Sequence, residues 1–368
     1  MKTIGILKEN IGDDRVCMLP EAVKKLTDQG FEVWFESHAG YGVGQLNVEY
    51  QKVGAVCTTA RKIYEEADII CSISHKYDGE NLGKSPCFVG VFNPLFHKKA
   101  LRKYISPASL YSLDLLPRST IAQRMDVLSS MASLSGYKAV LLASNMYNGA
   151  IPMFTTAAGT LKPAKFLILG AGVAGLQAIA TAKRLGAIVE AFDVRSSAAE
   201  EVRSLGAKFI EVEGFVESND AGGYAVTQTE EFQDKQQQLI HEHALQADIV
   251  ICTANIPGKA APILLKENTV LKMKKGAVII DMASEQGGNC ELTQNNRTED
   301  QNGVTILGDS HLSKLLPLAA SKMLSNNYLN YLQHFLTNEN SELKTQTMIM
   351  HKGEIVHPRL QPQPALSN

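Results

Sequence analysis

Short apolar runs alternate with helical patterns along the N-terminal third of the chain. The runs that we predict to be strands are Thr3–Leu7, Glu32–Glu36, Asp68–Ile73, Phe88–Phe92 and Ser109–Leu115. Between them, apolar residues at helical spacing predict helices such as Glu21–Gln29 and Leu101–Tyr104. Strands that alternate with helices predict a parallel sheet with helices on both faces.

A second series of apolar runs predicts another sheet further along the chain. Its predicted strands are Phe166–Leu169, Ile188–Phe192, Lys208–Glu211, Asp248–Cys252, Ala277–Asp281 and Thr305–Leu307. These strands suffice for a complete doubly wound dinucleotide fold. The stretch from about Ser119 to Asn145 is rich in Ala, Leu, Met and Ser, and it predicts one long helix between the two sheets. Two polar stretches are predicted to be a loop or lid and an irregular segment, namely Ser218–Gln228 and Asn289–Asn302.

A length of 368 residues is enough for two hydrophobic cores. A helix with apolar residues at helical spacing returns at Ser321–Leu336, and we expect it to pack on the first domain. We therefore predict an α/β protein of two Rossmann-like, doubly wound parallel-sheet domains with a cleft between them. The expected boundaries are 1–130 plus 310–360 for the discontinuous first domain, 131–309 for the second, and 361–368 for a disordered tail.

The composition is that of an ordinary globular protein, with 45% hydrophobic and 20% charged residues. The net charge of -2 gives no reason to expect nucleic acid or an acidic membrane as a partner. The six cysteines form no C-x-x-C pair, and several lie in apolar runs, which indicates reduced, buried thiols and a cytosolic protein. We find no signal peptide and no span that would insert into a membrane.

Three glycines follow the strand Phe166–Leu169 in G-x-G-x-x-G spacing: Gly170, Gly172 and Gly175. The first allows a tight turn, the second lets a pyrophosphate approach the backbone, and the third lets helix and strand pack closely. The following helix offers free N–H groups and a partial positive charge to phosphates. With a strand before, a helix after and an acid at the expected distance, the pattern predicts dinucleotide binding.

That acid is Asp193, at the end of the next predicted strand. A carboxylate here can accept hydrogen bonds from the adenosine ribose and repels a 2′-phosphate, so it favours NAD over NADP. Arg195 lies two residues further on. An arginine there could accept a 2′-phosphate, but we interpret Arg195 as a solvated surface side chain.

A second polar group lies at Arg118, Gln123, Asp126 and Ser129. The last three are spaced three residues apart, so on one helix they would share a face with Arg118 about a turn or more upstream. A cation, an amide, a carboxylate and a hydroxyl could hold a carboxamide and a ribose. The alternative is a solvated helix surface, and the pattern alone leaves both open.

Two loops follow buried strands of the second domain. One runs from Thr253 to Pro262 and the other from Asp281 to Asn289. The carboxyl edge of a doubly wound sheet is its usual ligand site, so these loops are the default site, with ordinary turn chemistry as the alternative. The histidines His75, His97 and His311 lie in no compelling constellation. His241 and His243 would point to different faces of a helix, so we expect no metal site there.

The chain resembles a known family at four places: GAGVAGLQAIATA from Gly170, AFDVR from Ala191, RSTIAQRMD from Arg118 and GGNC from Gly287. The family is the NAD(H)-binding component of proton-translocating NAD(P) transhydrogenase, which is related to alanine dehydrogenase. The resemblance covers nearly the whole chain and implies hydride transfer between NAD(H) on this chain and NADP(H) on a partner domain.

The resemblance also implies roles for individual residues. It places Arg118, Gln123, Asp126 and Ser129 at the nicotinamide, its carboxamide and its ribose, as the catalytic group. It places the pyrophosphate on Gly172, Val173, Ala174 and Gly175, the adenosine ribose on Asp193, and Tyr224 in a lid. The full set that it implies for cofactor binding is Gly170, Gly172, Val173, Ala174, Gly175, Asp193, Val194, Arg195, Gly223, Tyr224, Thr253, Ala254 and Asn255.

The resemblance further implies a homodimer that works with membrane-spanning and NADP(H)-binding subunits. The chain itself would then be cytoplasmic, on the cytosolic side of the inner membrane and not inserted in it. One alternative is an alanine dehydrogenase, for which Ser74 and Asn93 replace an expected lysine and histidine, while Glu285 lies where a catalytic aspartate is expected. Another alternative is a non-catalytic NAD-sensing module.

Overall fold

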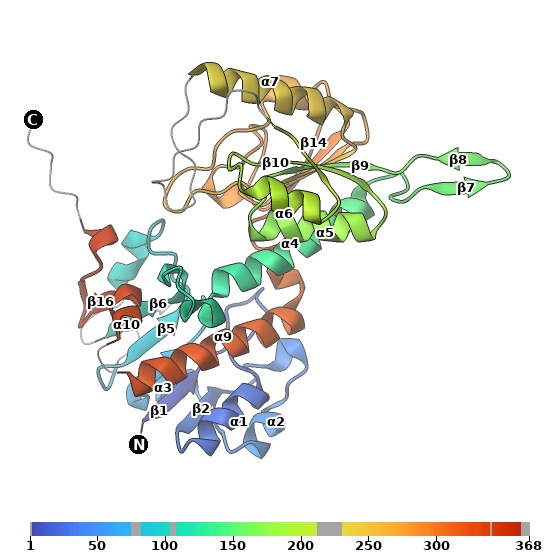
Figure 1. The fold of residues 1–368 in the computed structure, drawn as a ribbon. Helices are drawn as coiled ribbons and strands as arrows, with labels where there is room; N and C mark the ends of the chain where they lie inside the picture. The colour runs from blue at the N-terminus through green and yellow to red at the C-terminus, as the bar shows by residue number, and fades with distance from the viewer. Residues whose placement is uncertain (1, 75–81, 104–107, 212–229, 339–340, 362–368) are drawn as a thin grey trace, which may run out of the picture. The chain divides into compact units, whose positions relative to one another are not determined.

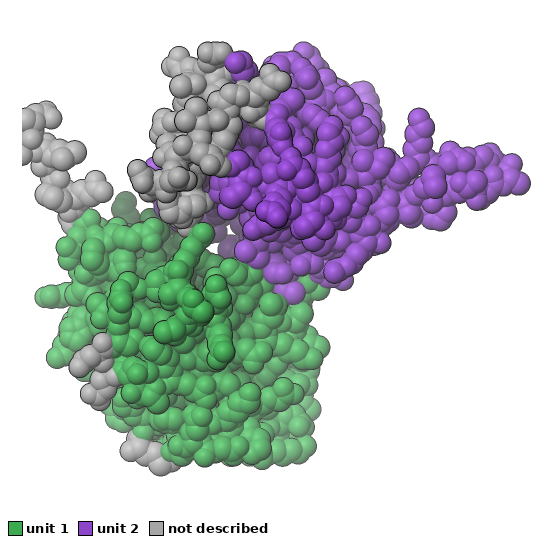
Figure 2. All heavy atoms as spheres, in the orientation of Figure 1, with its two compact units in different colours: residues 1–131, 316–368 green, residues 132–315 purple. Residues whose placement is uncertain are grey.

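The computed structural model describes residues 2–74, 82–103, 108–211, 230–338 and 341–361. The chain divides into two compact units, which Figure 2 shows in different colours. Unit 1 comprises Met1–Met131 and Leu316–Asn368, and unit 2 comprises Ala132–Leu315. The first boundary falls inside a helix, α4 (Val127–Met146).

Unit 1 is built on an eight-stranded sheet in the order β17-β16-β6-β5-β4-β1-β2-β3. The first six strands of the chain pair in parallel, whereas β16 joins β6 and β17 in antiparallel fashion. The strands are β1 (Thr3–Ile6), β2 (Glu32–Glu36), β3 (Val56–Thr58), β4 (Ile69–Cys71), β5 (Cys87–Gly90), β6 (Ser109–Ser112), β16 (Met348–His351) and β17 (Glu354–Ile355).

Helices cover both faces of this sheet (Figure 1). The α-helices of unit 1 are α1 (Pro20–Asp28), α2 (Asn47–Lys52), α3 (Ala60–Glu66), α9 (Pro317–Thr337) and α10 (Glu342–Thr347). The 3-10 helices are η1 (Tyr41–Val43), η2 (Lys98–Lys103), η3 (Leu113–Leu115), η4 (Ala122–Met125) and η7 (Pro358–Leu360). One core joins Ile4 and Ile6 of β1 to α1 and α9, and the core on the other face includes Ile63 and Tyr64 of α3.

Unit 2 contains a seven-stranded sheet in the order β11-β10-β9-β12-β13-β15-β14. All pairs are parallel except β14 with β15 at the edge. The strands are β9 (Lys165–Leu169), β10 (Ile188–Phe192), β11 (Lys208–Phe209), β12 (Ile249–Cys252), β13 (Val278–Asp281), β14 (Arg297–Gln301) and β15 (Val304–Gly308). The chain builds outward from β9 to β11 and then returns to β12 on the other side, which is the strand order of a dinucleotide-binding fold.

Apolar side chains of β9 alternate between two cores, as expected for a sheet covered on both faces. Phe166 and Ile168 pack with α4 and α5, whereas Leu167 and Leu169 pack with α7. The helices of unit 2 besides α4 are α5 (Val173–Arg184), α6 (Ala198–Ser204), α7 (Glu230–Gln246), α8 (Glu267–Val270), η5 (Ser284–Gln286) and η6 (Leu312–Leu315). The predicted doubly wound α/β fold is confirmed.

A hairpin of two short strands, β7 (Phe154–Thr156) and β8 (Gly159–Leu161), projects from unit 2 (Figure 1). It forms a two-stranded sheet of its own, in which Phe154 lies opposite Leu161. Both side chains are exposed, at 50% and 59%. The sequence analysis did not predict this hairpin.

The predicted strands match observed strands with ends shifted by a few residues at most. Three predictions of secondary structure were wrong. The single helix over 119–145 is instead η4, a break at Asp126 and then α4. The segment Leu101–Tyr104 includes part of η2 rather than an α-helix, and the stretch 289–302 contains strand β14. The predicted lid at 218–228 lies outside the described residues, as does the tail beyond Gln361.

Candidate functional site

The ends of three neighbouring strands define one edge of the unit 2 sheet. Leu169 of β9 pairs in register with Cys252 of β12, which in turn pairs with Asp281 of β13. The loops that follow these residues therefore leave the sheet side by side. The strand order reverses between β9 and β12, and in open α/β sheets this is where a nucleotide binds.

The glycine-rich turn has the geometry that a bound pyrophosphate requires. Gly170 has a φ of 100°, which only glycine adopts readily. A Cβ on Gly175 would lie 1.9 Å from the carbonyl oxygen of Gly170, so the helix can approach the strand only without a side chain. Gly172 is the N-cap of α5, no side chain caps that helix, and no atom lies within 4 Å of a Cβ built on Gly172. The first N–H groups of α5 therefore face open space, which suits a phosphate.

Asp193 follows β10, and its carboxylate is already engaged. One oxygen accepts the N–H of Ala171 at 2.7 Å, within the glycine-rich turn. Arg195 adds a two-pronged ion pair, with Nε on Oδ1 at 2.9 Å and Nη2 on Oδ2 at 3.0 Å. The two side chains are 7% and 32% exposed. Our interpretation of Arg195 as a solvated side chain was therefore wrong, because a planar guanidinium beside a carboxylate binds it at two points.

The loop after β12 binds back to the glycine-rich turn. The hydroxyl of Thr253 donates to the carbonyl oxygen of Gly170 at 2.9 Å. The next residue, Ala254, is held by Asn289 from the loop after β13, whose side-chain oxygen accepts the N–H of Ala254 at 3.0 Å. Asn255 is exposed and donates to the Gln286 side-chain oxygen at 3.4 Å. Two residues that the sequence analysis did not single out, Asp281 and Asn289, thus organise these loops.

The Arg118 segment does not form one helix face. Gln123 lies exposed in η4, whereas Asp126 lies between η4 and α4 in extended conformation. Asp126 acts as the cap of α4, because its carboxylate accepts the N–H of Ser129 at 2.9 Å and the hydroxyl of Ser129 at 2.6 Å. Arg118 is exposed in the loop before η4. The structure brings Asp126 and Ser129 together, and it shows no common helix face with Arg118 and Gln123.

Comparison with protein families covers nearly the whole chain. Residues 5–135 match the N-terminal domain and residues 139–358 the C-terminal domain of the family described as alanine dehydrogenase/PNT. The chain belongs to the alanine dehydrogenase/PNT family.

Curated members of the alanine dehydrogenase/PNT family differ in their similarity to the chain. It is 40% identical to an NAD(P) transhydrogenase subunit alpha protein of Rhodospirillum rubrum, over 98% of this chain and 100% of that protein. The protein of the same name from Rickettsia prowazekii is 37% identical, over 97% and 96% of the two chains. An alanine dehydrogenase of Staphylococcus epidermidis is 25% identical, over 90% and 86%.

Solved structures of this family have the same fold. A crystal structure of a transhydrogenase from Sinorhizobium meliloti superposes with a TM-score of 0.85 at 37% identity, over 97% of this chain and 99% of that one. An L-alanine dehydrogenase gives a TM-score of 0.81 at 22% identity, over 98% of both chains, which shows a common fold.

Residues of unit 1 that the sequence analysis compared with alanine dehydrogenase are held by other protein groups. Arg15 is 6% exposed and forms a two-pronged ion pair with Asp13, with Nε on Oδ1 at 2.8 Å and Nη2 on Oδ2 at 2.7 Å. Ser74 donates its N–H to the buried carboxylate of Glu9 at 2.9 Å. Asn93 has a φ of 46° in the loop after β5. Burial, above all, raises the pKa of Glu9 to about 7.

The histidines bind separate partners. His241 contacts the hydroxyl of Thr269 at 2.8 Å, and His243 contacts the carboxylate of Glu190 at 2.6 Å. His311 lies 3.3 Å from a carboxylate oxygen of Glu285. Among the described residues, no three His, Cys, Asp or Glu side chains gather in a way that could hold a metal ion. Two predicted cofactor residues, Gly223 and Tyr224, and also His75, lie outside the described residues.

Two further observations concern the rest of the chain. No helix in the described segments is both long and apolar enough to span a bilayer. The six cysteines are all free, and four of them are buried.

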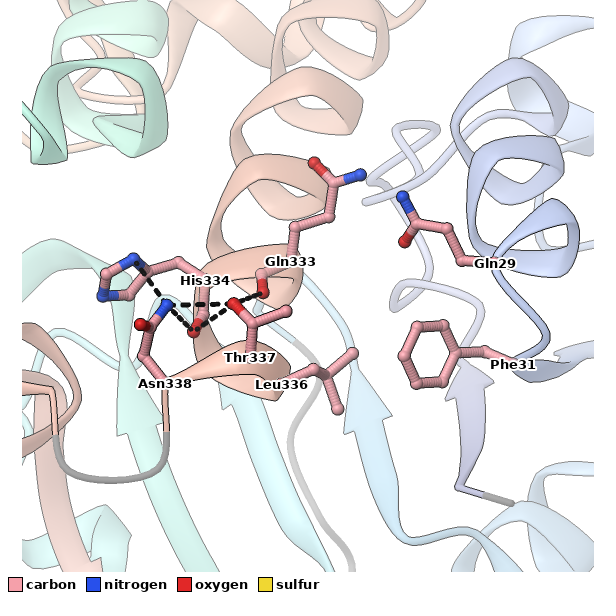
Figure 3. Close-up of a pocket in the computed structure, with 7 residues that line it drawn as sticks. All are labelled: Gln29, Phe31, Gln333, His334, Leu336, Thr337 and Asn338. Carbon is pink, nitrogen blue, oxygen red and sulfur yellow. Dashed lines mark hydrogen bonds between the residues drawn. The ribbon is translucent and has the colours of Figure 1, made fainter.

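A pocket of about 330 Å³ lies in unit 1 at the end of α9, where the amide groups of Gln29 and Gln333 extend toward each other (Figure 3). Its lining residues are Gln29, Phe31, Gln333, His334, Leu336, Thr337 and Asn338. None of the predicted site residues is among them, and none is Lys or Arg, so the pocket offers no fixed positive charge to a pyrophosphate.

Proposed function

We propose that the chain is the NAD(H)-binding subunit of a proton-translocating NAD(P) transhydrogenase. In this function it exchanges hydride with NADP(H) held by a partner domain. The observation that carries the proposal is the similarity over the full length to two proteins named as NAD(P) transhydrogenase subunit alpha, at 40% and 37% identity. The glycine-rich turn of unit 2 supports it, because an uncapped helix N-terminus beside the turn fits a pyrophosphate.

Asp193 supports the choice of NAD(H) over NADP(H). Its carboxylate lies at the end of β10 beside the turn, within hydrogen-bond distance of the N–H of Ala171. The ribose hydroxyls of NAD can donate to such a carboxylate, and a 2′-phosphate at this position would be repelled. The neighbouring Arg195 does not offset this preference while it remains paired with Asp193.

The nicotinamide itself carries the hydride, so the residues of this chain bind, orient and exclude water. We assign the pyrophosphate to the N–H groups of Val173, Ala174 and Gly175. Arg118, Gln123, Asp126 and Ser129 are proposed to orient the nicotinamide, its carboxamide and its ribose. Thr253, Ala254 and Asn255 are proposed to flank the nicotinamide half, because they follow the strand on the far side of the switch point.

The finer assembly is also a proposal. We expect the chain to act at the cytosolic side of the inner membrane through membrane-spanning and NADP(H)-binding subunits, and to form a homodimer. The hairpin β7–β8 supports a homodimer, because an isolated two-stranded sheet with Phe154 and Leu161 exposed is stable only when another surface covers it.

An absorbance assay with an NADP analogue tests the function. The purified chain should bind NADH and oxidise it only when an NADP-binding partner domain of a transhydrogenase and the analogue are both added. NADH oxidation by pyruvate and ammonia without a partner would instead identify an alanine dehydrogenase. The burial and pairing of Arg15 with Asp13 disfavour that outcome, because the guanidinium is not available to a substrate carboxylate in this arrangement. Binding without turnover in either assay would leave a sensing module.

A further inference from the structure

Asn289 is fully buried at the carboxyl edge of the unit 2 sheet, and its amide uses both kinds of hydrogen-bonding group. The oxygen accepts the N–H of Ala254 at 3.0 Å. The nitrogen donates to the carbonyl oxygens of Ala254 at 2.8 Å and of Pro262 at 2.9 Å. One side chain therefore clasps both backbone groups of Ala254 and ties the start of the Thr253–Pro262 loop to its end.

Asp281 in turn fixes the position of Asn289. The Asp281 side chain is fully buried, and its Oδ2 accepts the N–H groups of Asn289 at 2.8 Å and Cys290 at 2.9 Å and the hydroxyl of Thr293 at 2.7 Å. Its Oδ1 accepts the N–H of Ala283 at 3.0 Å. A Cβ on Gly288 would lie 2.7 Å from Oδ2, and Gly288 has a φ of 84°, so the chain passes this carboxylate only as glycine.

The clasp on Ala254 also determines the distance to the glycine-rich turn. Thr253 donates to the carbonyl oxygen of Gly170, and a Cβ on Gly170 would lie 2.7 Å from the Thr253 hydroxyl and 3.0 Å from the backbone nitrogen of Ala254. The three loops thus form one hydrogen-bonded assembly that runs from β13 through β12 to β9. Asn289 is the member that connects the outer loop to the inner two.

We propose that Asn289 is a positioning residue for the nicotinamide half of the bound nucleotide, acting through Ala254. This inference rests on the proposed function and adds a residue that contacts no cofactor atom itself. The strand order supplies the reason for a one-sided effect. The adenosine half lies over β9 and β10, where Asp193 is, and the nicotinamide half lies over β12 and β13, where the Ala254 loop is.

The test is the full-length variant Asn289→Asp, which keeps the size of the side chain and the acceptor for the Ala254 N–H. It removes both donors, so the carbonyl oxygens of Ala254 and Pro262 lose their partner beside a negative charge. We expect the dissociation constant for NADH, from fluorescence titration, to rise at least about tenfold, while that for 5′-AMP, from calorimetry, changes by less than about twofold. The matched control is Ser135→Ala, which removes another buried acceptor of unit 2, the hydroxyl that binds the Ser313 N–H at 3.1 Å.

Two results would overturn the proposal: an unchanged NADH affinity, or equal losses for NADH and 5′-AMP, since equal losses indicate general loosening of unit 2. Should Asn289→Asp fail to fold, Thr293→Val decides, because it removes one donor from Asp281 and should weaken NADH about threefold without affecting 5′-AMP. A wild-type chain that binds NADH but exchanges no hydride with an NADP analogue would refute the proposed function alone. The difference between the two ligands would still decide the role of Asn289.

Discussion

Asp126 caps helix α4 through both polar groups of Ser129, with its two carboxylate oxygens at 2.9 Å from the N–H and 2.6 Å from the hydroxyl. The residues that we assign to the nicotinamide ribose therefore already satisfy each other. A role in helix capping and a role in cofactor orientation both require them, and variants can separate the two roles.

Asp126→Ala should lower the free energy of unfolding by about 1 kcal/mol in urea denaturation, because it removes the cap. Asp126→Ser should restore most of that stability, since serine also caps helices. Hydride transfer to an NADP analogue should remain low in both variants if the carboxylate orients the cofactor. Recovery of both stability and rate in Asp126→Ser would mean that Asp126 is only a cap.

Gly172 and Gly175 offer a matched pair of substitutions. A Cβ on Gly172 meets no atom within 4 Å, so Gly172→Ala should leave Tm unchanged yet weaken NADH binding, because the methyl group occupies the approach to the helix N-terminus. A Cβ on Gly175 lies 1.9 Å from a backbone oxygen, so Gly175→Ala should lower Tm by several degrees. Calorimetry and NADH titration check both. Unchanged NADH affinity in Gly172→Ala would argue against the pyrophosphate assignment.

The ion pair between Asp193 and Arg195 predicts how cofactor preference can change. Asp193→Ser should weaken NADH about tenfold and strengthen NADPH, since it releases a guanidinium that can bind a 2′-phosphate. Adding Arg195→Ala should cancel the gain for NADPH without restoring NADH. If Asp193→Ser leaves NADH affinity unchanged, the ribose assignment is wrong.

Gln123 is exposed in η4, and Asn327 of α9 holds this helix by donating to the Arg124 carbonyl oxygen at 3.0 Å. Gln123→Ala should slow hydride transfer by about tenfold or more at saturating NADH, with little change in NADH affinity, as expected for an orienting residue. Arg124→Ala is the control, because it changes the neighbouring exposed side chain and keeps the backbone contact. Equal loss of rate and affinity in Gln123→Ala would contradict an orienting role.

Glu9 should make stability depend on pH. Burial raises its pKa from 4.5 to about 7, so the folded state binds the proton more tightly than the unfolded state. The resulting stability is complete below pH 4.5 and is lost as pH rises through about 7, with a total of the order of 3 kcal/mol. The wild type minus Glu9→Gln difference in unfolding free energy should therefore fall from pH 5 to pH 8 in roughly that proportion. A constant difference across this range would show that Glu9 does not titrate there.

The parts of the fold that the sequence predicted are those in which one physical signal dominates. Strands such as Ile249–Cys252 are buried on both faces, so they appear as continuous apolar runs. Strand β14, Arg297–Gln301, is polar because it forms the edge of the sheet, and it resembles a loop in sequence. The break at Asp126 had a readable signal, an aspartate at a helix start, which we interpreted as part of a continuous helix.

The candidate site divides in a similar way. The glycine-rich turn and Asp193 are predictable because their spacing follows from local backbone geometry. The pairing of Arg195 with Asp193 and the clasp of Asn289 on Ala254 depend on which groups meet in the folded unit. A lone asparagine after two glycines looks like turn chemistry until the two carbonyl oxygens that it binds are known.

The discontinuity of unit 1 has a consequence for biosynthesis. All of the unit 2 sequence, 132–315, leaves the ribosome before α9, whereas α9 supplies Leu324, Tyr328, Tyr331 and Leu332 to the core against β1 and β2. The unit that begins first is therefore completed last, and its sheet waits with one face uncovered while a later unit can already fold. Nascent chains released before Pro317 would expose this face and become substrates for chaperones or proteases.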